Sequence, residues 1–93
     1  MHGRGAGREA DLSEPIGVRV RLTFAEHLVR EPVLARLARR FDVEPNISRA
    51  NVDEVQGWIL CELLGPPQAV EAALGWLQEA GVTVDLLGDV LEG

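Results

Sequence analysis

The sequence predicts an α+β fold: a ferredoxin-like βαββαβ sandwich, with a four-stranded antiparallel sheet and two helices on one face. Two observations predict this class: the order of the periodic segments and the length of the chain. Apolar residues alternate with period two in some segments and recur at helical spacing in others, in the order strand, helix, strand, strand, helix, strand. The chain has 93 residues, enough for one domain. Two βαβ-like halves with right-handed crossovers produce this sheet and place both helices together.

The first half begins with a strand over residues 18–24, in which every second residue from Val18 to Phe24 is apolar. A loop over residues 25–30 follows. Glu31 and Pro32 then open a helix that ends near Asp42, since the first turn of a helix tolerates a proline without an N–H group. The apolar stripe of this helix consists of Val33, Leu34, Leu37, Ala38 and Phe41.

The second half begins with an extended segment over residues 43–55. Its alternation is imperfect, which predicts a β-bulge at a position that the sequence does not give. Gln56 and Gly57 favour a tight reversal. Residues 58–64, the most apolar run of the chain, form the next strand.

A second helix is expected over residues 67–80, with an apolar stripe of Val70, Ala73, Leu74 and Leu77. Gly81 favours a left-handed C-terminal cap, which lets Val82 pack back on Leu77. The last strand follows from Val82. We therefore expect one domain over residues 16–88, a flexible glycine- and charge-rich tail over residues 1–15, and a C-terminal tail over residues 89–93.

The composition excludes several classes of function. The net charge is −6, which argues against nucleic acid as a partner, because phosphate binding needs clustered positive charge. A single cysteine excludes an internal disulfide and a cysteine-based metal site, and no cofactor is expected. No apolar run approaches the roughly 18–20 residues of a membrane span, and residues 1–8 lack the apolar core of a secretory signal. We expect a cytoplasmic protein that does not insert into membranes.

No catalytic constellation emerges from the reactive residues. Cys61 lies in the most apolar strand, which predicts a buried and inert thiol. His2 and His27 lack a second histidine at the spacing of metal ligands. Ser48 and His27 do not belong to a nucleophile-elbow pattern. The sequence therefore predicts a protein that is not an enzyme.

Residues 46–51 form the least ordinary segment, because two asparagines occur in a strand-like stretch and asparagine is depleted in strands. One interpretation is a strand start with a bulge. The other is a binding site, since an asparagine amide both donates and accepts hydrogen bonds and can hold both polar ends of a small ligand.

Several short stretches resemble one known family, and their order and spacing match it over residues 18–87. They are Leu22–Phe24, the helix start at Pro32, Ala38–Val43, Asn46–Ile47, Val55–Gly57, Glu62–Gly65, Ala73–Leu77 and Gly81–Val82. The family is the NIL domain, the C-terminal regulatory domain of methionine-import ABC transporter ATPases, which also occurs fused to ferredoxin-type iron–sulfur domains. The resemblance implies a ferredoxin-like fold, pairing with a second copy, and L-methionine binding near the interface.

The resemblance also implies roles for particular residues. Asn46 matches the ligand-contacting asparagine of the family. The chain departs from the family at Ser48, where an aliphatic residue is usual, and in a shorter hairpin after Gly57. It also lacks a P-loop and a cysteine cluster, so we expect a free-standing domain that acts through another chain.

The leading hypothesis is a regulatory or sensor module that binds L-methionine or a related sulfur amino acid at a homodimer interface. Asn46 would bind the head group, Ile47 and Ser48 would line the site, and Arg49 would offset the carboxylate charge. The dimer interface would contain Trp58, Leu60 and Leu64, on the sheet face that no helix covers. The expected partner is a transporter or sulfur-metabolism protein.

The alternative hypothesis is a protein–protein adaptor in amino-acid transport or sulfur metabolism, with no small ligand. Its open sheet face or an edge strand would dock the partner.

Overall fold

A computed structural model describes residues 14–89, and it has the predicted order of elements. These are β1 (Ile16–Phe24), a 3-10 turn η1 (Glu26–Leu28), α2 (Val33–Arg40), β2 (Glu44–Val52), β3 (Gly57–Gly65), α3 (Pro67–Glu79) and β4 (Thr83–Asp89). Residues 1–13 and 90–93 of the expected tails lie outside the described residues. Apart from η1, which lies in the expected loop, the helices and strands are those predicted.

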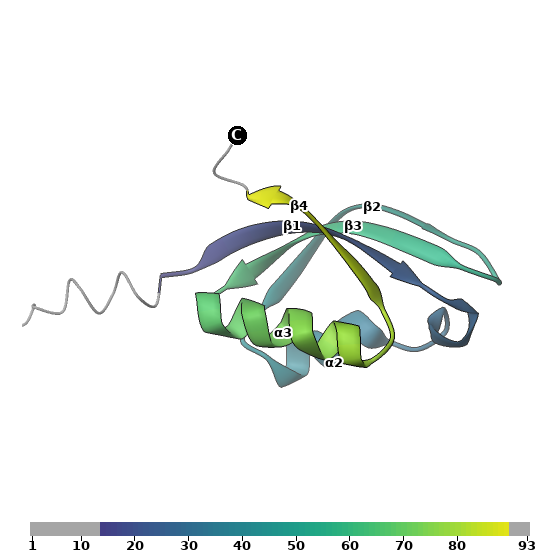
Figure 1. The fold of residues 1–93 in the computed structure, drawn as a ribbon, viewed down its shortest axis with the longest axis horizontal. Helices are drawn as coiled ribbons and strands as arrows, with labels where there is room; N and C mark the ends of the chain where they lie inside the picture. Colours follow the sequence, from purple (N-terminus) through teal and green to yellow (C-terminus); the bar gives the residue numbers. More distant parts are fainter. Residues whose placement is uncertain (1–13, 90–93) are drawn as a thin grey trace, which may run out of the picture.

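The four strands form one sheet in the order β2-β3-β1-β4, and every neighbouring pair is antiparallel. The two central strands, β1 and β3, pair over nine residues, from Ile16 opposite Gly65 to Phe24 opposite Gly57. Both helices lie on the same face of the sheet (Figure 1). The predicted α+β, ferredoxin-like sandwich is therefore confirmed.

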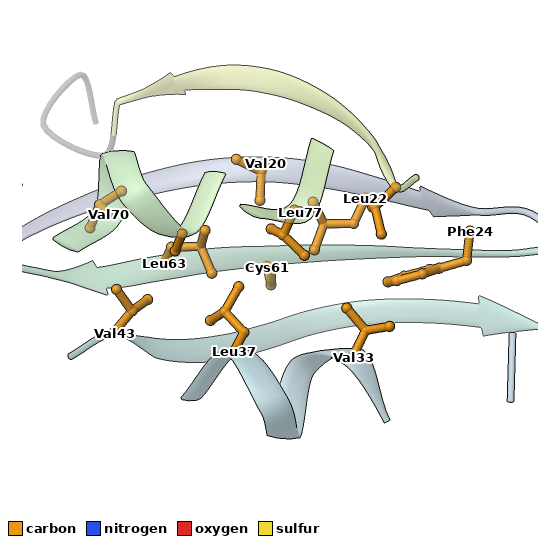
Figure 2. Close-up of a cluster of buried hydrophobic side chains, with 12 residues drawn as sticks. Val20, Leu22, Phe24, Val33, Leu37, Val43, Cys61, Leu63, Val70 and Leu77 are labelled. Atoms are coloured by element: carbon orange, nitrogen blue, oxygen red, sulfur yellow. The ribbon is translucent and has the colours of Figure 1, made fainter. Parts of the chain in front are cut away.

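The core fills the space between the helices and the central strands (Figure 2). Leu22 of β1, Leu63 of β3, Leu37 of α2 and Leu77 of α3 are fully buried in it. Burying a leucine contributes roughly 1.5–3 kcal/mol, so these four residues account for a large part of the driving force. Among the described residues no polar or charged residue is buried.

The first helix is shorter than predicted. It begins at Val33, and Pro32 precedes it as the cap residue, with a carbonyl that accepts the N–H of Arg36 at 3.0 Å. It ends at Arg40, because Phe41 is already extended. A helix of eight residues makes little more than two turns, so few of its residues can face the sheet. Val33 and Leu37 are buried, whereas Ala38 of the predicted stripe is exposed.

The second helix ends as the sequence predicts. Gly81 has a φ of 98°, a left-handed conformation that glycine adopts without steric cost. The N–H of Gly81 donates to the carbonyl of Gln78 at 3.1 Å, and that of Val82 to the carbonyl of Leu77 at 3.0 Å. This pair of bonds is a Schellman motif. Val82 and Leu77 are both buried and belong to the same hydrophobic core cluster.

The expected bulge in the second strand lies at Ser48. Ile47 pairs with Cys61 and Arg49 with Leu60, so the residue between them has no partner. The Ser48 hydroxyl donates to the carbonyl of Leu60 at 3.2 Å, which anchors the bulge to β3. One extra residue reverses the alternation, and Asn46 and Arg49 therefore share a face although they are three residues apart.

The reversal between β2 and β3 differs from the prediction, because Gly57 is already the first residue of β3. The turn consists of residues 53–56, and the Asp53 N–H donates to the carbonyl of Gln56 at 2.9 Å. One carboxylate oxygen of Asp53 accepts the N–H groups of Val55 at 2.8 Å and Gln56 at 2.9 Å. The aspartate side chain therefore organises the turn that the sequence had assigned to Gln56 and Gly57.

Asp53 should stabilise the fold in a pH-dependent way. The N–H groups of Gln56 and Val55 lower the pKa of Asp53 from 3.8. A carboxylate with a lower pKa in the folded state stabilises that state above the unfolded pKa, and the contribution is lost as the pH falls through the folded pKa. Asp53→Ala should therefore lower the unfolding temperature at neutral pH, and this difference should shrink below pH 3.8.

Thermal unfolding followed by circular dichroism from pH 2 to 7 measures this effect. Glu54→Ala is the matched control, since Glu54 is also exposed in the turn. A temperature difference that does not change with pH would contradict the role of the ionised Asp53 carboxylate.

Candidate functional site

The face of the sheet opposite the helices carries the candidate site. Directly opposite residues of antiparallel strands share a face, so the register identifies this open face. It combines charged, polar and apolar side chains from all four strands. These are Arg19, Arg21 and Thr23 of β1, Trp58, Leu60, Glu62 and Leu64 of β3, Glu44, Asn46, Arg49 and Asn51 of β2, and Thr83 and Asp85 of β4.

A hollow of about 460 Å³ lies on this face, and we call it the open-face hollow. Its polar lining residues are Arg19, Asn46, Ser48 and Glu62. Its apolar lining residues are Leu60 and Leu87, together with Val20, Ile47 and Cys61, whose side chains belong to the helix-facing row. Two of these residues, Ser48 and Leu87, are bulge positions of the edge strands β2 and β4. Bulges increase the local twist of a strand, and both of these bulges border the hollow.

The four residues predicted to bind a ligand separate into two groups. Asn46, Ile47 and Ser48 line the open-face hollow, whereas Arg49 is absent from its lining. Ile47 pairs with Cys61, a core residue, and so belongs to the helix-facing row. The Ser48 hydroxyl is bonded to the backbone of β3, and Asn46 is the residue of this group whose side chain lies on the open face.

Sequence reasoning missed Arg19 and Glu62 as site residues. They lie directly opposite each other on β1 and β3, and both line the open-face hollow. The sequence contained one signal, since Glu62 interrupts the most apolar strand of the chain. Arg19 and Glu62 lie opposite each other because of the register between β1 and β3, and these two strands are not adjacent in the chain.

The residues predicted to form an interface, Trp58, Leu60 and Leu64, lie on the open face, as the alternation predicted. Each is half-buried. The guanidinium of Arg21 lies 5.2 Å from the centroid of the Trp58 ring, a cation–π distance. Trp58, Leu60 and Leu64 therefore form an apolar stripe that is one strand wide and lies beside the arginines of β1.

Larger apolar exposure occurs elsewhere, on β4, where Leu86 and Leu87 are 64% and 50% exposed.

The chemistry available for catalysis is limited in the described residues. Cys61 is 3% exposed, and burial raises the pKa of its thiol from 9.0 to about 11. Within residues 14–89, no three histidine, cysteine, aspartate or glutamate residues lie close enough together to hold a metal ion. No helix in the same range has the length and apolar character needed to cross a membrane.

Cys61 should react slowly with thiol reagents while the protein is folded. The thiolate is the reactive form, and the rise in pKa reduces its population near pH 8 by about 100-fold. Release of thionitrobenzoate from DTNB at pH 8 should be at least about 100-fold slower for the folded chain than for the chain in guanidinium chloride. Because Cys61 is the single cysteine, the absorbance reports one site. Equal rates in both conditions would refute the burial of this thiol.

Comparison with known proteins assigns the chain to a family. The family model of the NIL domain matches residues 18–85. The chain is 41% identical over 75 residues to the methionine import ATP-binding protein MetN of Escherichia coli (strain K12) and of Shigella sonnei (strain Ss046). The matches cover 76% of this chain and 22% of each relative, so the chain spans about a fifth of their length.

A solved structure supports the same assignment. The C-terminal domain of an ABC transporter ATP-binding protein from Enterococcus faecalis superimposes with a TM-score of 0.69 and 26% sequence identity, over 78% of this chain and 86% of that one. The family model, the relatives and the superposed structure each match about three quarters of the chain, and the chain therefore belongs to the NIL domain family.

Proposed function

We propose that residues 16–88 form a regulatory module that binds L-methionine or a related sulfur amino acid in the open-face hollow. The observation on which the proposal depends is the position of Asn46 in that hollow, beside the apolar Leu60. The relatives of the chain are methionine import proteins, which favours this ligand class.

The lining of the hollow suits such a ligand. The Asn46 amide both donates and accepts, and so can bind the head group of an amino acid. Leu60 and Leu87 offer apolar surface to an aliphatic or thioether side chain. In this proposal the bound module acts through another protein, a transporter component or a protein of sulfur metabolism.

Isothermal titration with L-methionine tests the role of Asn46. Asn46→Ala should weaken binding about 10-fold or more, because a hydrogen bond to a charged group contributes about 1.5–3 kcal/mol. Asn51→Ala is the matched control, since Asn51 lies on the same strand and face, opposite Trp58, and does not line the hollow. Its affinity should equal that of the unmodified chain.

A thermal shift provides a second measurement. L-Methionine at 100 times its dissociation constant should stabilise the fold by about 2.7 kcal/mol. Absence of both heat and a thermal shift at millimolar L-methionine would refute the methionine proposal.

We further propose that two copies pair through their open faces. Trp58, Leu60 and Leu64 form an apolar stripe on this face, and a twofold arrangement buries the same stripe on both copies. The charges of the face also suit self-association. Outside the hollow, two arginines, Arg21 and Arg49, are balanced by two acids, Glu44 and Asp85. A second copy can therefore meet opposite charges around the stripe.

Light scattering at micromolar concentration should give twice the chain mass of 10.1 kDa. Trp58→Glu should shift the mass to that of one chain, because it places a charge in the paired stripe. Gln68→Glu is the control, since it adds the same charge at an exposed position of α3, on the helix side. A mass near 10.1 kDa at every concentration would contradict the dimer.

The adaptor function has its own supporting observation, the exposure of Leu86 and Leu87 on the edge strand β4. Neighbouring exposed leucines are typical of a surface that contacts another protein. A stable partner recovered from native cell extract, together with indifference to amino acids, would favour the adaptor over the ligand-binding module.

A further inference from the structure

The open-face hollow contains a cation, an anion and an amide in one row across three strands. Arg19 of β1 lies opposite Glu62 of β3, and Glu62 lies opposite Asn46 of β2. Directly opposite residues have Cβ atoms about 4.5–5.5 Å apart. All three residues line the hollow. Their functional groups are therefore within reach of one small molecule.

Arg19 and Glu62 are not bonded to each other, although their charges are opposite. Among the described side chains, those of residues 14–88, the structure contains one ion pair, Arg36 with Glu31 at 3.1 Å. The Glu62 carboxylate lies instead over Gly17, where a β-carbon would overlap it. The missing side chain at position 17 therefore makes room for the carboxylate. No ion pair joins either charged group to another side chain of residues 14–88, so within this part of the chain both can bind another molecule.

Three other hollows of the described residues each offer charge of one sign. The apolar cavity of about 200 Å³ between residues 25–32 and the start of α2 has Glu31 as its charged lining residue. The groove beside Asp42 and Glu44 is acidic, and the charged lining of the groove beside Trp76 consists of arginines. A free amino acid carries an ammonium group and a carboxylate, each of which needs an opposite charge or hydrogen bonds when it leaves water. Among these four hollows, the open-face hollow provides both charges.

We propose that the open-face hollow recognises the two charged groups of a free α-amino acid, with Arg19 bound to the carboxylate and Glu62 bound to the ammonium group. The planar guanidinium of Arg19 suits a carboxylate, and the Glu62 carboxylate accepts hydrogen bonds from an ammonium group. Asn46 adds a hydrogen bond from the third strand. The inference rests on the proposed function, because it assigns the recognition chemistry of the same hollow.

This assignment defines the ligand class. A residue within a peptide has neutral amides in place of its α-ammonium and α-carboxylate groups, and leaves both Arg19 and Glu62 without a partner. Arg19 is exposed and Glu62 is half-buried in the free chain, so a ligand that covers them without pairing them removes their hydration and weakens binding. The hollow should therefore select free amino acids over peptides and over analogues blocked at either end.

Blocked ligands test the assignment on the unmodified full chain. Isothermal titration compares L-methionine with N-acetyl-L-methionine, which lacks the ammonium group, and with L-methioninamide, which lacks the carboxylate. Each blocked analogue should bind about 10-fold or more weakly than L-methionine. Equal affinity for either analogue would overturn the assignment of the corresponding group.

Variants of the two charged residues link each protein charge to one ligand charge. Glu62→Gln should weaken L-methionine binding about 10-fold or more and leave N-acetyl-L-methionine unchanged. Arg19→Met should weaken L-methionine binding similarly and leave L-methioninamide unchanged. Glu71→Gln and Arg39→Met are the matched controls, because they remove the same charges from exposed positions of α3 and α2, on the helix side. Both should bind like the unmodified chain.

The outcomes separate this inference from the proposed function. If L-methionine binds and both variants keep their full affinity, the charge assignment is wrong and the proposed function stands. If no free amino acid binds the unmodified chain, both are wrong. Circular dichroism verifies that each variant folds, and the blocked analogues decide the question on the unmodified chain if a variant does not.

Discussion

The pairing of β1 with β3 is the interaction on which the rest of the structure depends. Its nine residue pairs determine which side chains of the two central strands face the helices. Leu22 and Leu63 enter the core, whereas Arg21 and Glu62 lie on the opposite face. A register slip of one residue would move every side chain of a strand to the other face. The core and the candidate site are therefore specified by the same set of backbone hydrogen bonds.

The two faces of the sheet differ in chemistry, and in the proposed function the helix side provides stability while the open face provides recognition. On the helix side the core is apolar, and no polar or charged residue of the described chain is buried there. Stability therefore comes from close packing and removal of apolar surface from water. On the open face the charges remain accessible, so their hydration is largely retained and they cost little in folding. Residues of the open face can change with little effect on the core.

The sequence predicted the elements whose side chains alternate or repeat regularly. The strict alternation from Val18 to Phe24 follows from one covered face, and the stripe of α3 follows from a helix long enough to span the sheet. The Gly81 cap was predictable because few other residues adopt a positive φ. In these places the interactions within one segment determine its structure, so the sequence of that segment is enough to predict it.

The features that the sequence left open depend on neighbours distant in the chain. The position of the bulge at Ser48 is determined by hydrogen bonding to Leu60 of β3. The turn was placed too late because the Asp53 side chain competes with Gly57 as a turn signal. Glu62 was visible as an interruption of an apolar run, but its position opposite Arg19 requires the register of non-adjacent strands. Asn46 was recognised as unusual, whereas the other members of its row were not.

The two bulges also affect how this sheet can grow. Both outer strands contain one, at Ser48 in β2 and at Leu87 in β4, and Pro45 removes one hydrogen-bond donor from β2. An intact outer strand is a template on which another chain can add as a further strand, the first step toward fibrous aggregation. Interrupted edges oppose such extension at both ends of the sheet. The open face can therefore keep its apolar stripe exposed while the edge strands resist the addition of further chains.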